Sequence, residues 1–199
     1  MSNKIYILVV LLFVSTSILA NSKTTNHKPK ISFREIIWGI THPFIALKVK
    51  RITHNALFVT DSLGKAKILT DKSGGRLDAF KHSYWMASLA KEIKPQKARK
   101  IGEIHEKVNY KSYKNGTSSQ DSTASAMDLL NNEIGISIGT INKSKSKKEL
   151  ISIIIDAIEN GKMYIIKKDK KGNYLDCNNH IIDLSKEKGW DKRKCLVGS

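Results

Sequence analysis

Three consecutive stretches with a helical pattern carry ionisable and amide side chains where an ordinary amphipathic helix needs only apolar bulk: residues 76–93, 97–110 and 121–139. Positions three or four apart share one face of a helix. Asp78 and His82 are spaced in this way, and so are Asp128 and Asn132. Because buried polar groups are almost always hydrogen-bonded, these helices must pack around a shared polar network or around a site.

The candidate site draws on all three stretches. We predict catalytic roles for residues that can exchange a proton or hold a cation: His82, His105, Glu106 and Asp128. Their neighbours are predicted to support them: Asp78, Lys81, Trp85, Asn131 and Asn132. Asp78 is placed to orient the His82 imidazole from behind. The set can hold a divalent metal ion or act without one, with a histidine as base, and the sequence leaves the cofactor unknown.

His105 and Glu106 begin the segment HEKVN, which is similar to the zinc-binding pattern H-E-x-x-H. Asn109 stands where the second histidine belongs, so the two-histidine clamp is missing and a metalloprotease is disfavoured. The chain contains no P-loop and no dinucleotide-binding fingerprint. Gly135 and Gly139 are four apart, which predicts that a neighbouring helix or the site itself approaches the backbone there.

The chain divides into four predicted segments. Residues 1–22 are typical of an export signal, with Lys4 before an apolar run that is too short to span a bilayer comfortably. An uncleaved N-terminal anchor is the alternative. A polar linker over 23–31 precedes a helical domain over 32–161, and residues 162–199 form a tail.

Local signals define the other elements. A helix is predicted over 43–59, and another begins after Ser146, which forms a capping box with Glu149. Strands MYIIKK and YLDC flank the turn KDKKGN, which predicts a hairpin. The fold class is therefore mainly α: a compact antiparallel helical domain with a small C-terminal β-hairpin.

Charge and cysteine content suggest the environment. Lys and Arg number 35 against 18 Asp and Glu, which gives a formal net charge of +17. Such an excess favours an anionic polymer, a membrane surface or nucleic acid as partner, although solubility alone is an equal explanation. Cys177 and Cys195 are the only cysteines, and in an exported chain they are expected to pair. No feature indicates an oligomeric state.

The combined pattern over about residues 38–160 resembles a bacterial domain family found as exported proteins and as C-terminal modules of polymorphic-toxin-like proteins. The family pattern is roughly N/D-A-F-R-H-x-x-W, then A-x-x-x-G-x-x-H-E, then D-x-x-N-N-x-x-G. This chain matches it at Asp78, Ala79, Phe80, His82, Trp85, Ala98, Gly102, His105, Glu106, Asp128, Asn131, Asn132 and Gly135. It departs at Lys81, where the family usually has arginine, a better bidentate partner for an anion. The resemblance implies a toxin-like enzymatic effector.

Two functions are consistent with these features. The first is an exported hydrolase with a His/carboxylate site that acts on an anionic envelope or nucleic-acid substrate. The second is a non-catalytic envelope-binding protein whose polar residues form a structural network. Convergence of His82, His105, Glu106 and Asp128 around an open cleft favours the hydrolase, whereas dispersal or a sealed core favours the binding protein.

Overall fold

The structure is a computed structural model that describes residue 37 and residues 39–199. The predicted signal peptide and the predicted linker lie outside the described residues. Two compact units divide the chain, Met1–Leu47 and Lys48–Ser199. In the described part of the first unit, Thr41 Oγ1 donates to the carbonyl of Ile37 at 3.1 Å and also contacts Nδ1 of His42 at 2.9 Å.

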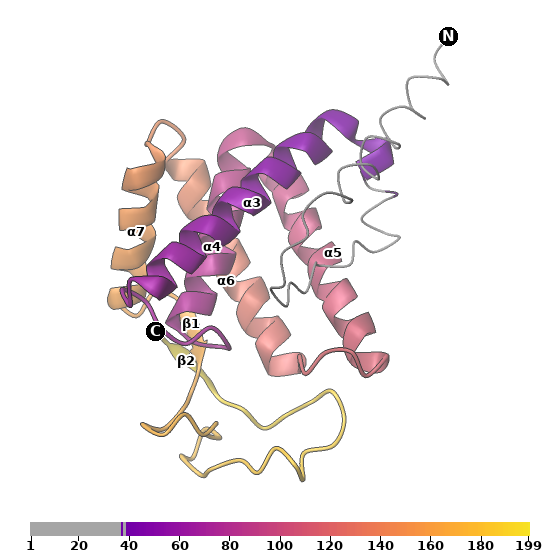
Figure 1. The fold of residues 1–199 in the computed structure, drawn as a ribbon, viewed down its shortest axis with the longest axis vertical. Coiled ribbons are helices and arrows are strands. Elements are labelled where there is room, and N and C mark those ends of the chain that lie inside the picture. Colours follow the sequence, from indigo (N-terminus) through magenta and orange to yellow (C-terminus); the bar gives the residue numbers. More distant parts are fainter. Residues whose placement is uncertain (1–36, 38) are drawn as a thin grey trace, which may run out of the picture. The chain divides into compact units, whose positions relative to one another are not determined.

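Helices dominate the described chain, in the order α3 Pro43–Lys65, α4 Arg76–Glu92, α5 Pro95–Lys114, α6 Ser122–Ile141 and α7 Lys147–Glu159 (Figure 1). Helix α3 is six residues longer than predicted. Helix α5 begins with Pro95, whose missing N–H costs nothing in the first turn. The predicted capping box of Ser146 and Glu149 is present at the start of α7. The mainly helical class is confirmed.

Helix α4 is the centre of the second unit. It packs chiefly against α6 and also against α5 and α7. Most of its side chains are buried, so it is apolar on several faces rather than along one stripe. Phe80 and Tyr84 stack within it, with ring centroids 5.3 Å apart. The polar His82 and Asp78 are therefore carried by the most enclosed helix in the described chain.

Two glycines allow α6 to approach α4 closely. A Cβ at Gly135 would stand 2.3 Å from the carbonyl oxygen of Ser83, and a Cβ at Gly139 would stand 2.1 Å from that of Ala87. Both distances are far inside van der Waals contact. The predicted close approach at these glycines is therefore confirmed, and the partner is the backbone of α4.

A small antiparallel sheet near the C-terminus joins β1 Tyr164–Ile166 to β2 Leu196–Gly198. The predicted hairpin class is confirmed, but β1 pairs with the C-terminal strand rather than with YLDC. The turn predicted over KDKKGN still forms, because Lys168 and Tyr174 make an isolated antiparallel bridge across it. The segment between β1 and β2 runs below the helices as an irregular loop (Figure 1).

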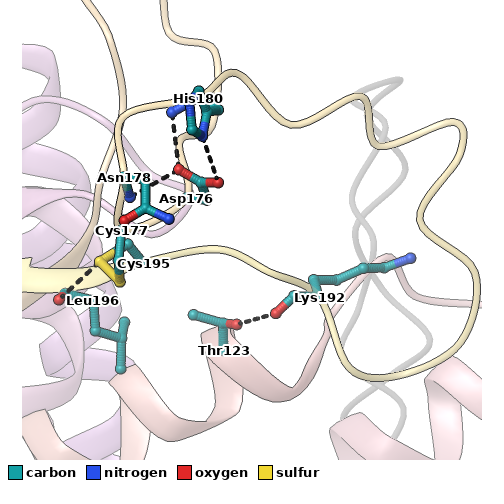
Figure 2. The surroundings of a disulfide bond; sticks show 8 residues. All are labelled: Thr123, Asp176, Cys177, Asn178, His180, Lys192, Cys195 and Leu196. Carbon is teal, nitrogen blue, oxygen red and sulfur yellow. Dashed lines mark hydrogen bonds and ion pairs between the residues drawn. A yellow bond between two sulfur atoms is a disulfide. The ribbon is translucent and has the colours of Figure 1, made fainter.

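The disulfide Cys177–Cys195 is present and closes this loop (Figure 2). The last part of the loop, residues 186–195, which we call the strap, is fixed to the start of α6. The Ser122 N–H donates to the Trp190 carbonyl at 3.0 Å, and Thr123 Oγ1 donates to the Lys192 carbonyl at 3.3 Å. The buried pair Lys194–Asp121 adds an ion pair at 2.6 Å. Within the described part of the chain, none of the helices has the length and apolar character needed to cross a membrane.

The close contact of α4 and α6 yields a first prediction. Gly139→Ala is expected to lower the free energy of unfolding by about 1–3 kcal/mol, because its methyl group would overlap the α4 backbone. The gain in helix propensity of roughly 1 kcal/mol does not offset that overlap. Urea denaturation measures the change. Ser137→Ala, at an exposed position of the same helix, is the control and should cost no stability. A Gly139→Ala variant as stable as the parent would contradict the packing.

Candidate functional site

Three predicted site residues converge between α4 and α6. Ligand atoms of Asp78, His82 and Asp128 all lie within 4.8 Å of one another. Nε2 of His82 stands 3.2 Å from Oδ1 of Asp128 and 3.8 Å from Oδ1 of Asp78. Both carboxylates therefore face the same ring nitrogen. Asp78 approaches His82 from one helical turn earlier in α4, on the same side of the ring as Asp128.

The other oxygen of each carboxylate is already held. Oδ2 of Asp78 accepts the N–H of Gly74 at 2.8 Å, and Oδ2 of Asp128 accepts the Gln120 amide at 2.9 Å. These bonds orient the two Oδ1 atoms toward His82. Oδ1 of Asp128 and Nδ1 of His82 are buried and have no well-aligned hydrogen-bond partner among the described residues.

Burial controls the protonation of this cluster. It lowers the pKa of His82 well below its usual value, with help from the positive charges of Lys81 and His105, so the imidazole is neutral at pH 7. Burial also raises the pKa of Asp128 well above its usual value, and the negative charges of Asp78 and Glu106 add to that effect. The cluster thus places a carboxyl that is harder to ionise than usual beside an uncharged imidazole.

Lys81 supplies the cation of the cluster. Its ammonium lies 2.5 Å from Oδ1 of Asp78. Burial works against the charge, but attraction to Asp78 and then to Asp128 and Glu106 outweighs it, so the pKa of Lys81 is raised. Lys81 is therefore engaged with the carboxylates rather than presented to an anion.

Glu106 occupies the α5 side of the cluster. Its carboxylate accepts the Ser125 hydroxyl at 2.5 Å and the Asn109 amide at 3.1 Å. Burial raises its pKa, although the two hydrogen bonds and the charge of Lys81 partly oppose that rise. The side chain lines an open groove of about 400 Å³, together with Glu103, Lys107, Tyr110, Leu129 and Trp190. Glu106 is thus the catalytic candidate that a substrate in this groove would meet.

His105 lies next to His82. The two rings are 6.2 Å apart between centroids, and the edge of Trp85 packs against His105 at 5.5 Å. Trp85 is fixed in turn, because its Nε1 donates to Thr53 Oγ1 at 2.9 Å. Trp85 therefore helps to set the position of His105.

The two consecutive asparagines have different surroundings. Asn131 accepts the Tyr164 N–H at 2.9 Å and donates to the Tyr164 carbonyl at 2.8 Å, so it fastens β1 to α6 in the manner of a strand partner. Asn132 lies beside His82, and its amide makes no well-aligned hydrogen bond among the described residues. Gly102 makes room for it, because a Cβ there would stand 2.9 Å from Nδ2 of Asn132. Asn131 is structural, and Asn132 belongs to the site.

Four contributors were not among the predicted site residues: Asn109, Gln120, Ser125 and Trp190. Asn109 and Ser125 had a usable signal, since each lies three positions from Glu106 or Asp128 on its own helix. Gln120 and Trp190 had none, because they reach the site from a loop and from the strap. The residue that replaces the second histidine of H-E-x-x-H thus has a role, which is to bind Glu106.

One segment matches a catalytic signature but serves helix packing. Residues 135–139 read GISIG, which matches the nucleophile signature G-x-S-x-G. That signature requires a sharp turn from a strand into a helix, whereas these residues lie inside α6 and Ser137 is exposed. The glycines serve the contact with α4, so a serine nucleophile at Ser137 is excluded by geometry.

A second, smaller cavity borders the cluster at Asp78. It measures about 140 Å³, and its lining includes Ser73, Asp78, Gln120, Tyr174 and Lys194. Asp78 and Gln120 connect this cavity to Asp128. Asp78, His82 and Asp128 supply two carboxylates and one imidazole, which are donors that divalent transition metals accept.

The second unit is thus a helical domain with a largely buried His/carboxylate cluster at its centre. The chain belongs to a family described as a domain of unknown function, DUF6973, whose sequence profile matches residues 36–162. No curated protein and no solved structure matches the chain. The matched region contains the whole cluster but not the strap, which contributes Trp190 and Lys194 to the linings of the two cavities.

The role assigned to Asn131 can be tested through stability. Asn131→Ala removes both partners of the Tyr164 backbone, and we expect a loss of about 2 kcal/mol in the free energy of unfolding. Asn160→Ala is the control, because its amide makes a single exposed bond to the Asp156 carbonyl. Denaturant midpoints compare the two. Equal, small losses would show that Asn131 does not fasten β1.

Proposed function

We propose that the protein is an exported hydrolase in which Glu106 acts as proton donor and acceptor at the base of the groove, with His82, His105 and Asp128 behind it. The observation that carries the proposal is the position of Glu106. It is a buried carboxyl at the edge of an open groove, fixed by two hydrogen bonds. A general acid needs this combination of access and fixed orientation.

The environment of Glu106 suits acid–base chemistry near neutral pH. Its pKa is raised, above all by burial, and the ideal catalytic pKa lies near the working pH. The groups that act on its charge are Lys81, which favours ionisation, and Asp78, which opposes it. Asp128, whose pKa is also raised, and the neutral ring of His82 add a second acid and a base to the same cluster.

The substrate class follows from charge and environment. The net charge of +17 attracts an anionic envelope polymer, a membrane surface or nucleic acid. The disulfide fits an oxidising environment outside the cytoplasm, which supports export. Tyr110 and Trp190 on the groove walls offer apolar surface to a sugar or a base, and Lys107 offers a positive charge. A toxin-like effector role agrees with the family resemblance.

A non-catalytic envelope-binding protein is the second candidate. It is favoured by the burial of the inner cluster, because His82 and Asp128 are only 2% and 3% exposed. In this alternative the cluster organises the helices, and the lysine-rich surface alone meets the partner. The two candidates predict different effects of a Glu106 substitution on hydrolysis. They predict the same effect of the surface charge on binding.

Glu106→Gln tests the proposed chemistry. We expect at least a hundredfold loss of hydrolysis, the usual scale for removing a general acid, on whichever of cell-wall polymer, anionic lipid or nucleic acid the parent degrades. Stability should not fall. A carboxyl with a raised pKa stabilises the fold at low pH and loses that contribution as pH rises through its folded pKa, so the variant should lose less stability than the parent as pH rises above about 4.5.

Glu133→Gln is the matched control, because it makes the same chemical change at an exposed carboxylate paired with Arg99. It should retain activity. His105→Ala should abolish activity while stability stays within about 1–2 kcal/mol of the parent. A parent that hydrolyses none of the three substrate classes, together with a His105→Ala variant that fails to fold, would leave the binding protein as the answer.

The lysine excess is tested by salt. Binding to anionic vesicles, cell-wall polymer or nucleic acid should weaken steeply between about 50 and 200 mM salt, because neutralised phosphates release counterions. Sedimentation with vesicles and fluorescence anisotropy with labelled polymer measure this. Affinity that does not change with salt would mean that the lysines serve solubility only.

A further inference from the structure

We propose that Asp78, His82 and Asp128 form a binding site for one divalent transition-metal ion, Zn²⁺ or Mn²⁺, which displaces Lys81 when it binds. The site lies between α4 and α6 and opens toward the smaller cavity. This inference concerns binding and stands apart from the proposed hydrolysis. It is argued from the positions of the donor atoms and from the buried groups that lack partners.

The donor atoms already lie near coordination distance. The three ligand atoms are within 4.8 Å of one another, and ligands bonded tetrahedrally to one ion at about 2.0–2.2 Å stand about 3.3–3.6 Å apart. A shift on the order of 1 Å, within the reach of side-chain torsions, closes the shell. Three protein ligands leave a position for water or substrate, and the cavity lined by Asp78 and Gln120 supplies the space.

The surrounding hydrogen bonds orient the ligands. Gly74 and Gln120 hold the Oδ2 atoms of Asp78 and Asp128, and the Oδ1 atoms are left to face Nε2 of His82. Metal-binding carboxylates are typically fixed in this way by a second layer of hydrogen bonds. Two independently anchored carboxylates aimed at one imidazole nitrogen are more than an acidic cluster.

Partnerless buried atoms provide the second line of argument. Oδ1 of Asp128 is buried and makes no hydrogen bond among the described residues, although a buried polar atom without a partner costs about 1–3 kcal/mol. An ion bound to this oxygen and to His82 removes that cost. It also adds positive charge beside the carboxyl groups of Asp78 and Asp128, to which Lys81 contributes in the described part of the chain.

Lys81 is the intrinsic competitor. Its ammonium lies against Oδ1 of Asp78 at 2.5 Å, where the ion would bind, and its side chain is 36% exposed. A long, partly exposed lysine can move its charge into solvent at low cost. The lysine therefore stands in for the ion, and removing its charge should favour metal binding.

The donor set selects the metal. Ca²⁺ takes six to eight oxygen ligands, which this buried site cannot supply from two carboxylates. One imidazole and two carboxylates suit Zn²⁺ and also Mn²⁺, which accepts carboxylate more readily than thiolate. The site should therefore discriminate against Ca²⁺.

The test is isothermal titration calorimetry of ZnCl₂ and MnCl₂ into tag-free, chelator-treated protein with its disulfide intact. One ion per chain should bind, Ca²⁺ should bind at least tenfold more weakly, and Asp128→Asn should weaken Zn²⁺ at least tenfold. Lys81→Met should strengthen it. His180→Ala is the control, because the exposed Asp176–His180 pair has the same spacing as Asp78–His82 but no third ligand.

The outcomes separate cleanly. No binding, or binding lost in His180→Ala and kept in Asp128→Asn, overturns the site. If Asp128→Asn fails to fold, Lys81→Met decides, since an unchanged or weakened affinity places the ion away from Asp78. A protein that binds Zn²⁺ at this site but hydrolyses none of the tested substrates supports the metal site and contradicts the proposed function.

Discussion

The contact between the α4 and α6 backbones is the constraint on which the rest of the second unit depends. Gly135 and Gly139 bring α6 against the carbonyls of Ser83 and Ala87, and this distance places Asp128 beside His82. A larger residue at either glycine would move the two helices apart and separate the carboxylates. Close helix packing and the polar cluster are therefore one feature, because the short polar side chains can meet only where the backbones nearly touch.

Helical pattern and capping predicted much of this arrangement from the sequence. The Ser146–Glu149 box predicted the start of α7 because a capping box acts within a single turn. The glycine pair predicted a close approach but not its partner. The orientation of Asp78 could not be predicted from its spacing to His82 alone, because Gly74 holds its Oδ2 and Lys81 holds its Oδ1.

The position of the strap could not be predicted from local sequence patterns. The sequence predicted that MYIIKK and YLDC pair as a hairpin, yet β1 pairs with Leu196–Gly198, some thirty residues later. The disulfide and the ion pair Lys194–Asp121 bring that distant segment back to α6. Trp190 and Lys194 then line the two openings beside the cluster. The sequences of the helices therefore give no indication that residues of the strap line these cavities.

The two asparagines help to distinguish a structural network from a site. A network that exists only to hold helices together should satisfy its members, because each unsatisfied buried group weakens the fold. Asn131 meets this expectation, since both ends of its amide are bonded to Tyr164. Asn132 and the His82 ring have only a poorly aligned contact with each other, and Oδ1 of Asp128 has no well-aligned partner, within the described chain. Their unused hydrogen-bonding capacity is concentrated around one imidazole, and buried polar groups left in that state are better explained by a ligand than by packing.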